Sequence, residues 1–327
     1  MKTILVTGGG GYIGSHACKA LSRSGYRPVT FDNFSTGWRE AVRFGPLEEG
    51  DLTDRRRIAE VFARYRPDAV MHFAALSEVG QSVTEPMRYW RNNVLGGMNL
   101  IEAMLESGIH SIVFSSTCAT YGDQDGVLLT EDTEQKPANA YGSSKMAIEE
   151  MLRDAGRVSP LRHVIFRYFN VAGADPEAEI GENHTPETHL VPRAIQAAQG
   201  RGPALTIFGT DYPTPDGTCI RDYVHVADLV DAHLRAMDWL QDGKPSAVFN
   251  LGTGNGFSVR EVLRSVERIA GREVPFETGE RRPGDCTSLV SAATRAMDVL
   301  GWRPRRSTLD DMVRDAWRWH ETDGFGT

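Results

Sequence analysis

The first half of the chain alternates short apolar runs with segments of helical spacing, and this alternation limits the possible fold most. The strand-like runs are TILVTG, PVTFD, DAVMHFAA, SIVFSST and HVIFRYFNVAG. Between them lie GYIGSHACKALSRSG, DRRRIAEVFARYRP, YWRNNVLGGMNLIEAMLESG and the segment that holds YGSSK, all with helical spacing. Apolar strands that alternate with helices are typical of a parallel sheet covered on both faces. We therefore predict an α/β fold with a doubly wound parallel sheet.

The pattern becomes less regular after about residue 173. Proline and glycine are frequent in GENHTPETHLVPRA and GTDYPTPDGT, although the strand-like runs LTIFG and AVFNLG and the helix-like VREVLRSVERIAG and TLDDMVRDAWRWH still occur. We expect one domain over residues 1–173 and a smaller, irregular α/β lobe over residues 174–327. Some segments of the lobe are expected to cross back to the first domain.

Composition excludes several classes of protein. The 327 residues are 40 % hydrophobic and 24 % charged, which is typical of a globular protein with a sizeable core. The net charge of −8, without a basic block, argues against a nucleic-acid binder. No apolar run approaches the roughly 18 residues of a membrane span. MKTILVTGGG reads as a buried strand rather than a signal peptide, because its apolar part stops at glycines.

Cysteine and histidine spacing gives no indication of a metal site. The cysteines are scattered and form no C-x-x-C pair, so neither disulfides nor zinc are expected, in keeping with a reducing cytoplasm: they are Cys18, Cys118, Cys219 and Cys286. His184 and His189 in HTPETH form the closest histidine pair. On a helix, residues i and i+5 do not share a face, and Pro186 lies between them, so we expect no metal there.

The turn between the first strand and the first helix has the pattern of a nucleotide site. TILVTGGGGYIGSHACKAL contains Gly8, Gly11 and Gly14 at G-x-x-G-x-x-G spacing. A backbone that turns sharply and approaches a diphosphate favours residues without Cβ, and the helix N-terminus offers N–H groups to phosphate. Asp32 ends the second strand, where a carboxylate accepts ribose hydroxyls and repels a 2′-phosphate. We predict a Rossmann-type site for NAD rather than NADP; the alternative is a glycine-rich turn without a ligand.

Two further stretches suit the same cofactor. In GDL, Asp51 is suited to bond an adenine amino group, with Leu52 against the ring. In FAA, Phe73, Ala74 and Ala75 end a strand where a cofactor would cross the sheet. Each stretch is equally compatible with a loop cap or with ordinary packing.

The segment YGSSK places Tyr141 and Lys145 four residues apart, so that on a helix both side chains emerge on one face. Alone, this pattern also suits a surface helix with a snorkelling lysine. Beside a dinucleotide it suits a general base, because an ammonium about 4 Å away can lower a tyrosine pKa from about 10 to about 7. The preceding strand end, FSSTCATYG, adds Thr117, whose hydroxyl either holds a substrate oxygen or simply ends the strand.

Together these residues resemble the extended short-chain dehydrogenase/reductase superfamily and, within it, the UDP-glucose 4-epimerases (UDP-galactose 4-epimerases). The resemblance covers essentially the whole chain through TGGGGYIGSH, FDN, GDL, HFAA, NNV, FSSTCATYG, YGSSK, RYFNVAGA, IFGTDYPTPDGTCIRDYVHV, NLGTG and RRPGD. It implies reversible epimerisation at C4 of UDP-galactose and UDP-glucose, with a bound NAD that is reduced and reoxidised in each cycle. It also implies a catalytic cleft between two lobes and a homodimer through the two long helices of the first domain.

Carried over to this sequence, the resemblance makes Tyr141 the base that removes the 4-hydroxyl proton, Lys145 the residue that lowers its pKa, and Thr117 the residue that orients the hydroxyl. The 4-keto sugar then turns about its bond to the diphosphate, and hydride returns to the other face. The implied cofactor residues are Gly8, Gly11, Tyr12, Ile13, Gly14, Asp32, Asn33, Asp51, Leu52, Phe73, Ala74, Ala75, Asn92, Tyr141, Lys145 and Phe169. The implied UDP-sugar residues are Thr117, Asn170, His189, Leu190, Phe208, Arg221, Tyr223, Arg282, Asp285 and Leu289.

Several positions leave the identity of the sugar in the UDP-sugar substrate undecided. A diphosphate suits arginine forks such as those of Arg221 and Arg282, although Arg281 stands beside the second of them. His189 occupies a position that is often asparagine in the similar enzymes, and many of them have serine in place of Thr117. Leu289 stands where they carry either tyrosine or a small residue, at a position that helps to admit an N-acetyl group. A UDP-pentose or a UDP-N-acetylhexosamine therefore stays an alternative substrate.

Other reactions on the same scaffold fit less well. Similar 4,6-dehydratases carry Asp-Glu after the threonine, where this chain has Cys118 and Ala119, which cannot expel a 6-hydroxyl. A nonenzymatic NAD-sensing protein would usually lose the tyrosine or the lysine. Dehydrogenases that oxidise C6 use a cysteine nucleophile and a different architecture.

Overall fold

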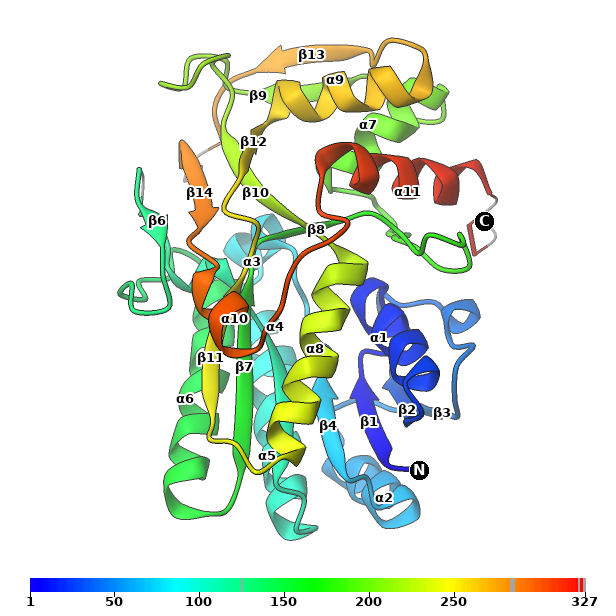
Figure 1. The fold of residues 1–327 in the computed structure, drawn as a ribbon, viewed down its shortest axis with the longest axis vertical. Helices are drawn as coiled ribbons and strands as arrows, with labels where there is room; N and C mark the ends of the chain where they lie inside the picture. Colours follow the sequence, from blue (N-terminus) through cyan, green and yellow to red (C-terminus); the bar gives the residue numbers. More distant parts are fainter. Residues whose placement is uncertain (125, 283–285, 323, 326–327) are drawn as a thin grey trace. The chain divides into compact units, whose positions relative to one another are not determined.

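The computed structural model describes residues 1–124, 126–282, 286–322 and 324–325 (Figure 1). Contacts divide the chain into a first unit of residues 1–122, 131–168 and 230–249 and a second unit of residues 123–130, 169–229 and 250–327. The division falls after Tyr168, and residues 230–249 return to the first unit. The domain boundary at residue 173 stays a prediction, because this division does not test whether either part folds alone.

The first unit is built around a seven-stranded sheet in the order β11-β7-β5-β4-β1-β2-β3. The register pairs Thr3 of β1 with Arg27 of β2, and Ile4 of β1 with Ala69 of β4, both in parallel. This order, with β1 between β2 and β4, is that of a doubly wound dinucleotide-binding sheet and confirms the predicted fold class. The strands are β1 (Thr3–Thr7), β2 (Arg27–Asp32), β3 (Leu47–Glu49), β4 (Ala69–His72), β5 (Ser111–Thr117), β7 (Arg162–Tyr168) and β11 (Ala247–Leu251).

Helices cover both faces of this sheet (Figure 1). On one face, α2, α5 and α6 bury strand side chains such as Leu5, Val70 and Ile112. On the other, α1 packs along β1 and β2, and α8 sets His233 against the rings of Phe73 and Phe166. The helices are α1 (Tyr12–Arg23), α2 (Arg55–Tyr65), α3 (Val79–Thr84), α4 (Pro86–Tyr89), α5 (Gly96–Glu106), α6 (Ala140–Val158) and α8 (Val226–Gln241), with the short turns η1 (Arg39–Ala41) and η3 (Cys118–Thr120) and the π-helical η2 (Trp90–Leu95).

The second unit has smaller sheets and its own core. One sheet has the order β12-β10-β14-β6, with β8 also paired to β10, and β13 pairs with β9. Its helices α7, α9 and α11 pack together around Ile195, Val262 and Val313, all buried. The elements are β6 (Leu128–Leu129), β8 (Asn170–Ala172), α7 (Leu190–Gln199), β9 (Leu205–Phe208), β10 (Ile220–His225), β12 (Gly256–Ser258), α9 (Val259–Ala270), β13 (Phe276–Gly279), β14 (Ser288–Ser291), α10 (Thr294–Val299) and α11 (Leu309–Glu321).

The segment HVIFRYFNVAG, predicted as one strand, forms two. β7 ends at Tyr168 in the seven-stranded sheet, whereas β8 pairs with β10 in the second unit, Asn170 opposite Tyr223. An apolar run indicates extended backbone but does not say which sheet it joins. The sequence analysis also left α8 unassigned, although it is a helix of 16 residues.

Candidate active site

The turn between β1 and α1 requires glycine at two positions. Gly8 has a φ of +74°, and a Cβ atom built on it would lie 2.6 Å from the Ala74 amide nitrogen. A Cβ atom on Gly14 would lie 2.1 Å from the carbonyl oxygen of Gly8. Real Cβ atoms do not approach backbone so closely, so side chains are excluded here. The turn therefore leaves the N-terminal N–H groups of α1 accessible to an anion.

Asp32 ends β2 at the carboxyl edge of the sheet, and its side chain is buried. Oδ2 accepts a hydrogen bond from the Gly10 amide at 2.8 Å, and Oδ1 accepts one from the Phe34 amide at 2.8 Å. Burial raises the pKa of Asp32, and these backbone donors oppose that rise. The carboxylate therefore holds the glycine-rich turn in place, a role that the sequence analysis did not assign to it.

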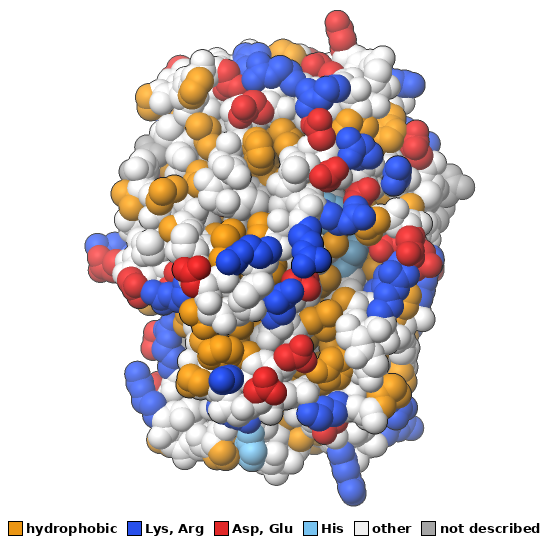
Figure 2. Space-filling model, in the orientation of Figure 1, with side chains coloured by type: hydrophobic (Ala, Val, Ile, Leu, Met, Phe, Trp, Pro, Cys, Tyr) orange, Lys and Arg blue, Asp and Glu red, His pale blue; other side chains and the backbone are white. Residues whose placement is uncertain are grey.

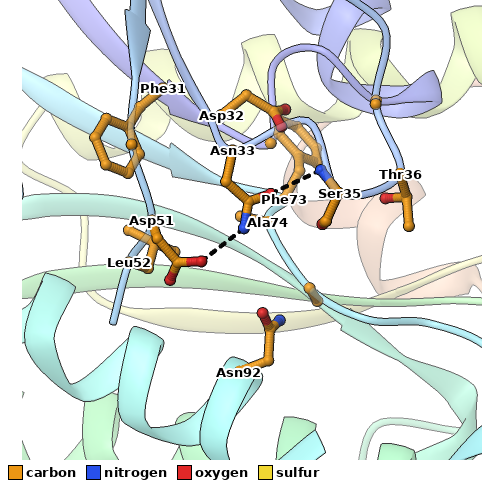
Figure 3. A pocket seen from close by; sticks show the side chains of 15 residues that line it. Phe31, Asp32, Asn33, Ser35, Thr36, Asp51, Leu52, Phe73, Ala74 and Asn92 are labelled. Atoms are coloured by element: carbon orange, nitrogen blue, oxygen red, sulfur yellow. Dashed lines mark hydrogen bonds between the residues drawn. The ribbon is translucent and has the colours of Figure 1, made fainter. Parts of the chain in front are cut away.

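A pocket beside Asp32 is lined by residues that follow β1, β2, β3 and β4 (Figure 3). Figure 3 shows the Asn33 side chain between two partners: its Nδ2 donates to Asp51 Oδ2 at 2.8 Å, and its Oδ1 accepts from the Ser35 amide at 3.0 Å. Asn92 reaches the pocket from η2. The complete lining is Gly8, Gly11, Phe31, Asp32, Asn33, Ser35, Thr36, Gly37, Gly50, Asp51, Leu52, Phe73, Ala74, Ala75 and Asn92.

The pocket and the predicted cofactor set overlap but are not identical. Predicted residues that do not line the pocket are Tyr12, Ile13, Gly14, Tyr141, Lys145 and Phe169, the last of which belongs to the second unit. Lining residues that were not predicted are Phe31, Ser35, Thr36, Gly37 and Gly50. Ser35, Thr36 and Gly37 could have been predicted from the segment DNFSTG. This segment is a loop that directly follows a strand, and such loops bind ligands at the carboxyl edge of open α/β sheets.

The start of α6 fixes the YGSSK segment. The side-chain oxygen of Asn139 caps the helix by accepting a hydrogen bond from the Gly142 amide at 2.9 Å. Asn93 of η2 donates from Nδ2 to the Ser144 hydroxyl at 3.0 Å. Tyr141 and Lys145 therefore lie one turn apart on a helix that is anchored at its first turn, as the spacing predicts.

The hydroxyl of Thr117 lies close enough to that of Tyr141 to favour the ionised phenol. Thr117 ends β5 and accepts a hydrogen bond from the Ala119 amide at 3.1 Å. Burial raises the pKa of Tyr141, the neighbouring Tyr168 adds to the rise, and the Thr117 hydroxyl opposes it. The sheet thus brings the two predicted hydroxyl groups together, with the phenol protonated at neutral pH.

Lys145 is buried, and its ammonium donates to the Ser115 carbonyl oxygen at 2.7 Å. Burial lowers the pKa of Lys145 to about 7, although the Glu149 carboxylate opposes this shift. The YGSSK spacing predicts an ammonium that lowers the pKa of the phenol, whereas without a bound cofactor burial raises the pKa of Tyr141. The reason is that desolvation acts on both groups: it favours the neutral phenol and removes part of the lysine charge.

A buried ion pair lies one turn beyond Lys145. Glu149 of α6 and Arg167 of β7 are both buried, and Arg167 donates to Glu149 from Nε at 3.0 and 3.2 Å and from Nη2 at 2.6 Å. The Ser116 hydroxyl adds a hydrogen bond to Glu149 at 2.5 Å. Neither charge was singled out from the sequence, because a glutamate on a helix and an arginine in a strand look like surface charges until the fold pairs them.

The predicted UDP-sugar residues other than Thr117 belong to the second unit. Asn170 of β8 stands opposite Tyr223 of β10, where burial raises the pKa of Tyr223 and the Asn170 side chain opposes this larger effect. Arg221 of β10 stands opposite Leu289 of β14 and donates to the backbone carbonyl of residue 286 at 3.0 Å. The pairing of β8, β10 and β14 therefore brings four of the predicted residues onto neighbouring strands.

The neighbouring arginines differ in their contacts. Arg281 donates from Nε to Asp211 at 2.7 Å, and its guanidinium lies over the Tyr212 ring. The guanidinium of Arg282 lies 4.0 Å from the centre of the Phe208 ring. Arg281 is thus engaged in an ion pair, whereas Arg282 lies on another predicted residue, which favours Arg282 as the ligand-binding arginine.

The remaining predicted residues lie at the start of α7 or outside the described part of the chain. His189 is the N-cap of α7, and Leu190 is its first residue. Asp285 lies outside the described residues.

Comparison with known proteins gives one consistent result. Residues 4–252 match the NAD dependent epimerase/dehydratase family. The chain is 52 % identical over 319 residues to UDP-glucose 4-epimerase from Rhizobium leguminosarum bv. trifolii, which covers 98 % of this chain and 97 % of the relative. UDP-glucose 4-epimerase from Brucella ovis, solved in complex with NAD, matches with a TM-score of 0.95 at 46 % identity over 97 % of this chain and 98 % of that chain. The enzyme from Bifidobacterium longum, in complex with NAD+ and UDP, matches with a TM-score of 0.93 at 35 % identity over 98 % of both chains. The resemblance inferred from the motifs is therefore confirmed, and the chain belongs to the NAD dependent epimerase/dehydratase family and, within it, to the UDP-glucose 4-epimerases.

Proposed function

We propose that the chain interconverts UDP-galactose and UDP-glucose at C4 of the sugar, with Tyr141 as the base and with NAD in the pocket beside Asp32. The closeness of Tyr141 and Thr117 at the carboxyl edge of the sheet carries the proposal. Tyr141 offers a proton acceptor and Thr117 offers a hydroxyl that can orient the substrate, and neighbouring strands of the same sheet end at the pocket. An alcohol carbon that loses hydride must also lose its hydroxyl proton, and this pair suits that step.

The pocket suits NAD by its shape and its chemistry. Gly8 and Gly14 permit the tight turn that presents the first N–H groups of α1 to a diphosphate, and Asp32 offers a carboxylate that binds ribose hydroxyls and repels a 2′-phosphate. When bound, NAD supplies a reversible hydride acceptor for C4 and, in its oxidised form, a positively charged ring. The proposal keeps all the predicted cofactor residues and adds Ser35 and Thr36, which line the same pocket.

Tyr141 takes the proton of the 4-hydroxyl and returns it when the product forms, and Thr117 orients that hydroxyl. Because burial raises the pKa of Tyr141, the phenol needs positive charge nearby before it can act as a base. Lys145 supplies part of this charge, since its pKa of about 7 leaves it partly protonated at neutral pH. The lysine also offers donors to a ribose hydroxyl of the cofactor.

The second unit supplies the proposed contacts to the UDP-sugar. Arg221 and Arg282 suit the diphosphate, because guanidinium groups donate in pairs to phosphate oxygens. The Phe208 ring offers an aromatic face beside Arg282. The complete proposed set remains Thr117, Asn170, His189, Leu190, Phe208, Arg221, Tyr223, Arg282, Asp285 and Leu289.

Glucose and galactose are the favoured sugars, and the comparisons do not favour the other reactions. Leucine at position 289 is intermediate in size between the tyrosine and the small residues of similar enzymes, so UDP-N-acetylhexosamines and UDP-pentoses are the substrates to compare. The 4,6-dehydratase alternative lacks its acid and base, because Cys118 and Ala119 follow Thr117.

The test is to incubate purified protein with UDP-galactose without added cofactor and to separate the products by chromatography. UDP-glucose should appear without net NADH, since each turnover returns the hydride. If no UDP-glucose forms even after NAD is added, the proposed hexose reaction is wrong. A UDP-pentose and a UDP-N-acetylhexosamine, incubated in parallel, then decide between the alternative substrates.

Asp32→Ala should lower the amount of NAD that copurifies with the protein by about tenfold or more. The substitution removes the acceptor for the ribose hydroxyls and also the acceptor of the Gly10 amide, which holds the turn. NAD released by heat denaturation is measured per chain. Glu40→Ala is the matched control, because Glu40 is an exposed acid on the same stretch of chain. Unchanged NAD content in Asp32→Ala would contradict the assignment.

We also propose a homodimer formed through helices of the first unit. Large apolar side chains lie exposed along α3, α4, η2 and α5: Val79, Val83, Met87, Trp90, Met98 and Leu105. Met87 is 70 % exposed and Val83 is 66 % exposed. Exposed apolar side chains gathered on neighbouring elements are typical of a protein interface, which supports packing of the long helices α5 and α6 against those of a second copy.

Met98→Glu should shift the protein from dimer to monomer, because it would bury a charge in the proposed interface. Size-exclusion chromatography with light scattering measures the mass. Val299→Glu is the control, since Val299 is an exposed apolar side chain on α10 of the second unit. If wild-type protein is a monomer at micromolar concentration, the interface proposal fails.

The proposed location is the cytoplasm, and the proposed partners include neither nucleic acid nor membrane. All four cysteines are free thiols in the structure, as suits a reducing compartment. In the face shown in Figure 2, basic and acidic side chains are interspersed. Among the described residues, no helix combines the length and the apolar character that crossing a bilayer requires.

A further inference from the structure

Four potential metal ligands converge in the loop that leads into α7. Nδ1 of His189 lies 3.0 Å from Glu182 Oε1 and 2.9 Å from Glu187 Oε1. Nδ1 of His184 lies 3.4 Å from Glu182 Oε1 and 3.7 Å from Glu187 Oε2. One donor atom from each of the four side chains can be chosen so that all lie within 4.8 Å of one another. The two imidazoles and the two carboxylates thus face a common centre.

This arrangement reverses an expectation from the sequence. The argument against a metal at HTPETH treated His184 and His189 as residues of a helix, where positions i and i+5 diverge. The structure has no helix over residues 182–189, all of which it describes, and α7 begins only at Leu190. Loop backbone brings the two imidazole rings to 5.0 Å between centroids.

The two carboxylates of the cluster are buried, whereas the side chains of His184 and His189 are 24 % and 42 % exposed, and one carboxylate oxygen lacks a hydrogen bond. The side chains of Glu182 and Glu187 are 5 % and 4 % exposed. Oε2 of Glu187 has no hydrogen-bond partner among the described residues, and its distance of 3.7 Å from His184 Nδ1 is too long for one. A buried carboxylate oxygen without a partner is costly, and it points into the cluster.

The charges of the cluster also suit a divalent cation. Two buried carboxylates require two positive charges nearby. One divalent cation supplies both charges while the two imidazoles bind it as neutral ligands.

We infer that Glu182, His184, Glu187 and His189 form a binding site for Zn2+. Nitrogen and oxygen ligands at about 2.0–2.1 Å from a tetrahedral zinc lie about 3.3 Å from one another. The four imidazole–carboxylate separations of 2.9, 3.0, 3.4 and 3.7 Å, which involve both oxygens of Glu187, lie around that value, and a set of one donor atom from each residue lies within 4.8 Å. Imidazole and carboxylate together suit zinc better than the harder magnesium and calcium ions.

Four protein ligands leave no open position on a tetrahedral metal, so the site is structural. It would cross-link the loop just before α7. The same loop is held from the other side by α11, because Trp319 donates from Nε1 to the Glu182 carbonyl oxygen at 2.9 Å. A metal would thus complete the anchoring of a loop that otherwise has no secondary structure. The inference shares His189 with the proposed UDP-sugar contacts, so its test is read from metal content rather than from turnover.

The test uses untagged full-length protein, treated with chelator, dialysed and titrated with Zn2+ and with Co2+. We expect about one equivalent of zinc per chain by mass spectrometry, a melting temperature that rises with zinc concentration, and visible absorption of tetrahedral Co2+. His184→Gln and Glu187→Gln should each weaken zinc binding at least tenfold. Glu177→Gln, which alters a second group of clustered acids (Asp175, Glu177 and Glu179) in the preceding loop, should bind like wild type.

Three outcomes would overturn the inference. Wild-type protein that takes up no stoichiometric zinc would show that the cluster is an ion-pair network only. Zinc binding that survives both His184→Gln and Glu187→Gln would place the metal elsewhere. Equal loss in Glu177→Gln would mean non-specific binding to acidic loops. Retained NAD and an unchanged circular dichroism spectrum establish that each variant is folded, so loss of zinc then reports on the site.

Discussion

Tyr141→Phe is expected to lower turnover about a thousandfold while NAD stays bound. A positioned base contributes about 10²–10⁴-fold to a rate, and phenylalanine keeps the ring while it removes the oxygen that takes the proton. The cofactor is retained because the glycine-rich turn and Asp32 belong to other elements of the first unit. The initial rate of UDP-glucose formation and the NAD content per chain are measured on the same preparation.

Tyr89→Phe is the matched control. The Tyr89 ring packs edge-on against that of Tyr141, with 6.5 Å between their centres, and its hydroxyl donates to the Glu78 carbonyl oxygen at 2.6 Å. Tyr89→Phe thus removes the same phenol oxygen from a neighbouring tyrosine whose hydroxyl has only a structural hydrogen bond. Turnover of this variant should change less than tenfold. If Tyr141→Phe keeps a tenth or more of wild-type turnover, Tyr141 is not the base. If folded Tyr141→Phe protein lost its NAD, the assignment of Tyr141 as the base would also be contradicted, because the loss of turnover would then follow from the missing cofactor.

Arg167→Met is expected to lower the free energy of unfolding by about 3–5 kcal/mol, because it leaves the Glu149 carboxylate buried without its main cation. Glu149 is inaccessible to solvent and Arg167 is 2 % exposed. Because Glu149 lies one turn beyond Lys145, the loss should also loosen the helix that carries Tyr141. Urea denaturation followed by circular dichroism measures the change.

Two variants decide whether the buried charge is the cause. Adding Glu149→Met to Arg167→Met should restore at least half of the lost stability, because neither charge is then buried alone. Arg157→Met should cost less than about 1 kcal/mol, since Arg157 pairs with Asp154 on the same helix but both side chains are more than two thirds exposed. A double variant as unstable as the single one would mean that lost packing, rather than the unpaired carboxylate, is responsible.

Local sequence was sufficient wherever a function depends on residues that are close in the chain. The glycine-rich turn, Asp32 at the end of β2, and the pair of Tyr141 and Lys145 were all placed correctly relative to their own strand or helix. The reason is that steric exclusion at Gly8 and the period of a helix act over a few residues. Thr117 could also be predicted as a site residue, because the apolar run SIVFSST ends at the residue where β5 ends.

Local sequence was insufficient where burial decides the chemistry. The charge on Lys145 and the pKa of Tyr141 follow from how completely the fold removes water from both groups, and no spacing reports this. The partner of Glu149 is 18 residues away on another element. His184 and His189 could not be recognised as neighbours, because the path of a loop depends on contacts such as that of Trp319.

The alternation of strands and helices, the nucleotide-binding turn and the family can all be predicted from the amino-acid sequence, because period, turn chemistry and motif order are properties of the chain. The three-dimensional structure was needed to show that HVIFRYFNVAG contributes to two sheets, that α8 covers the first sheet, which charges are buried together, and that four potential ligands meet before α7. These features depend on contacts between residues far apart in the chain, whose free energy no local pattern encodes.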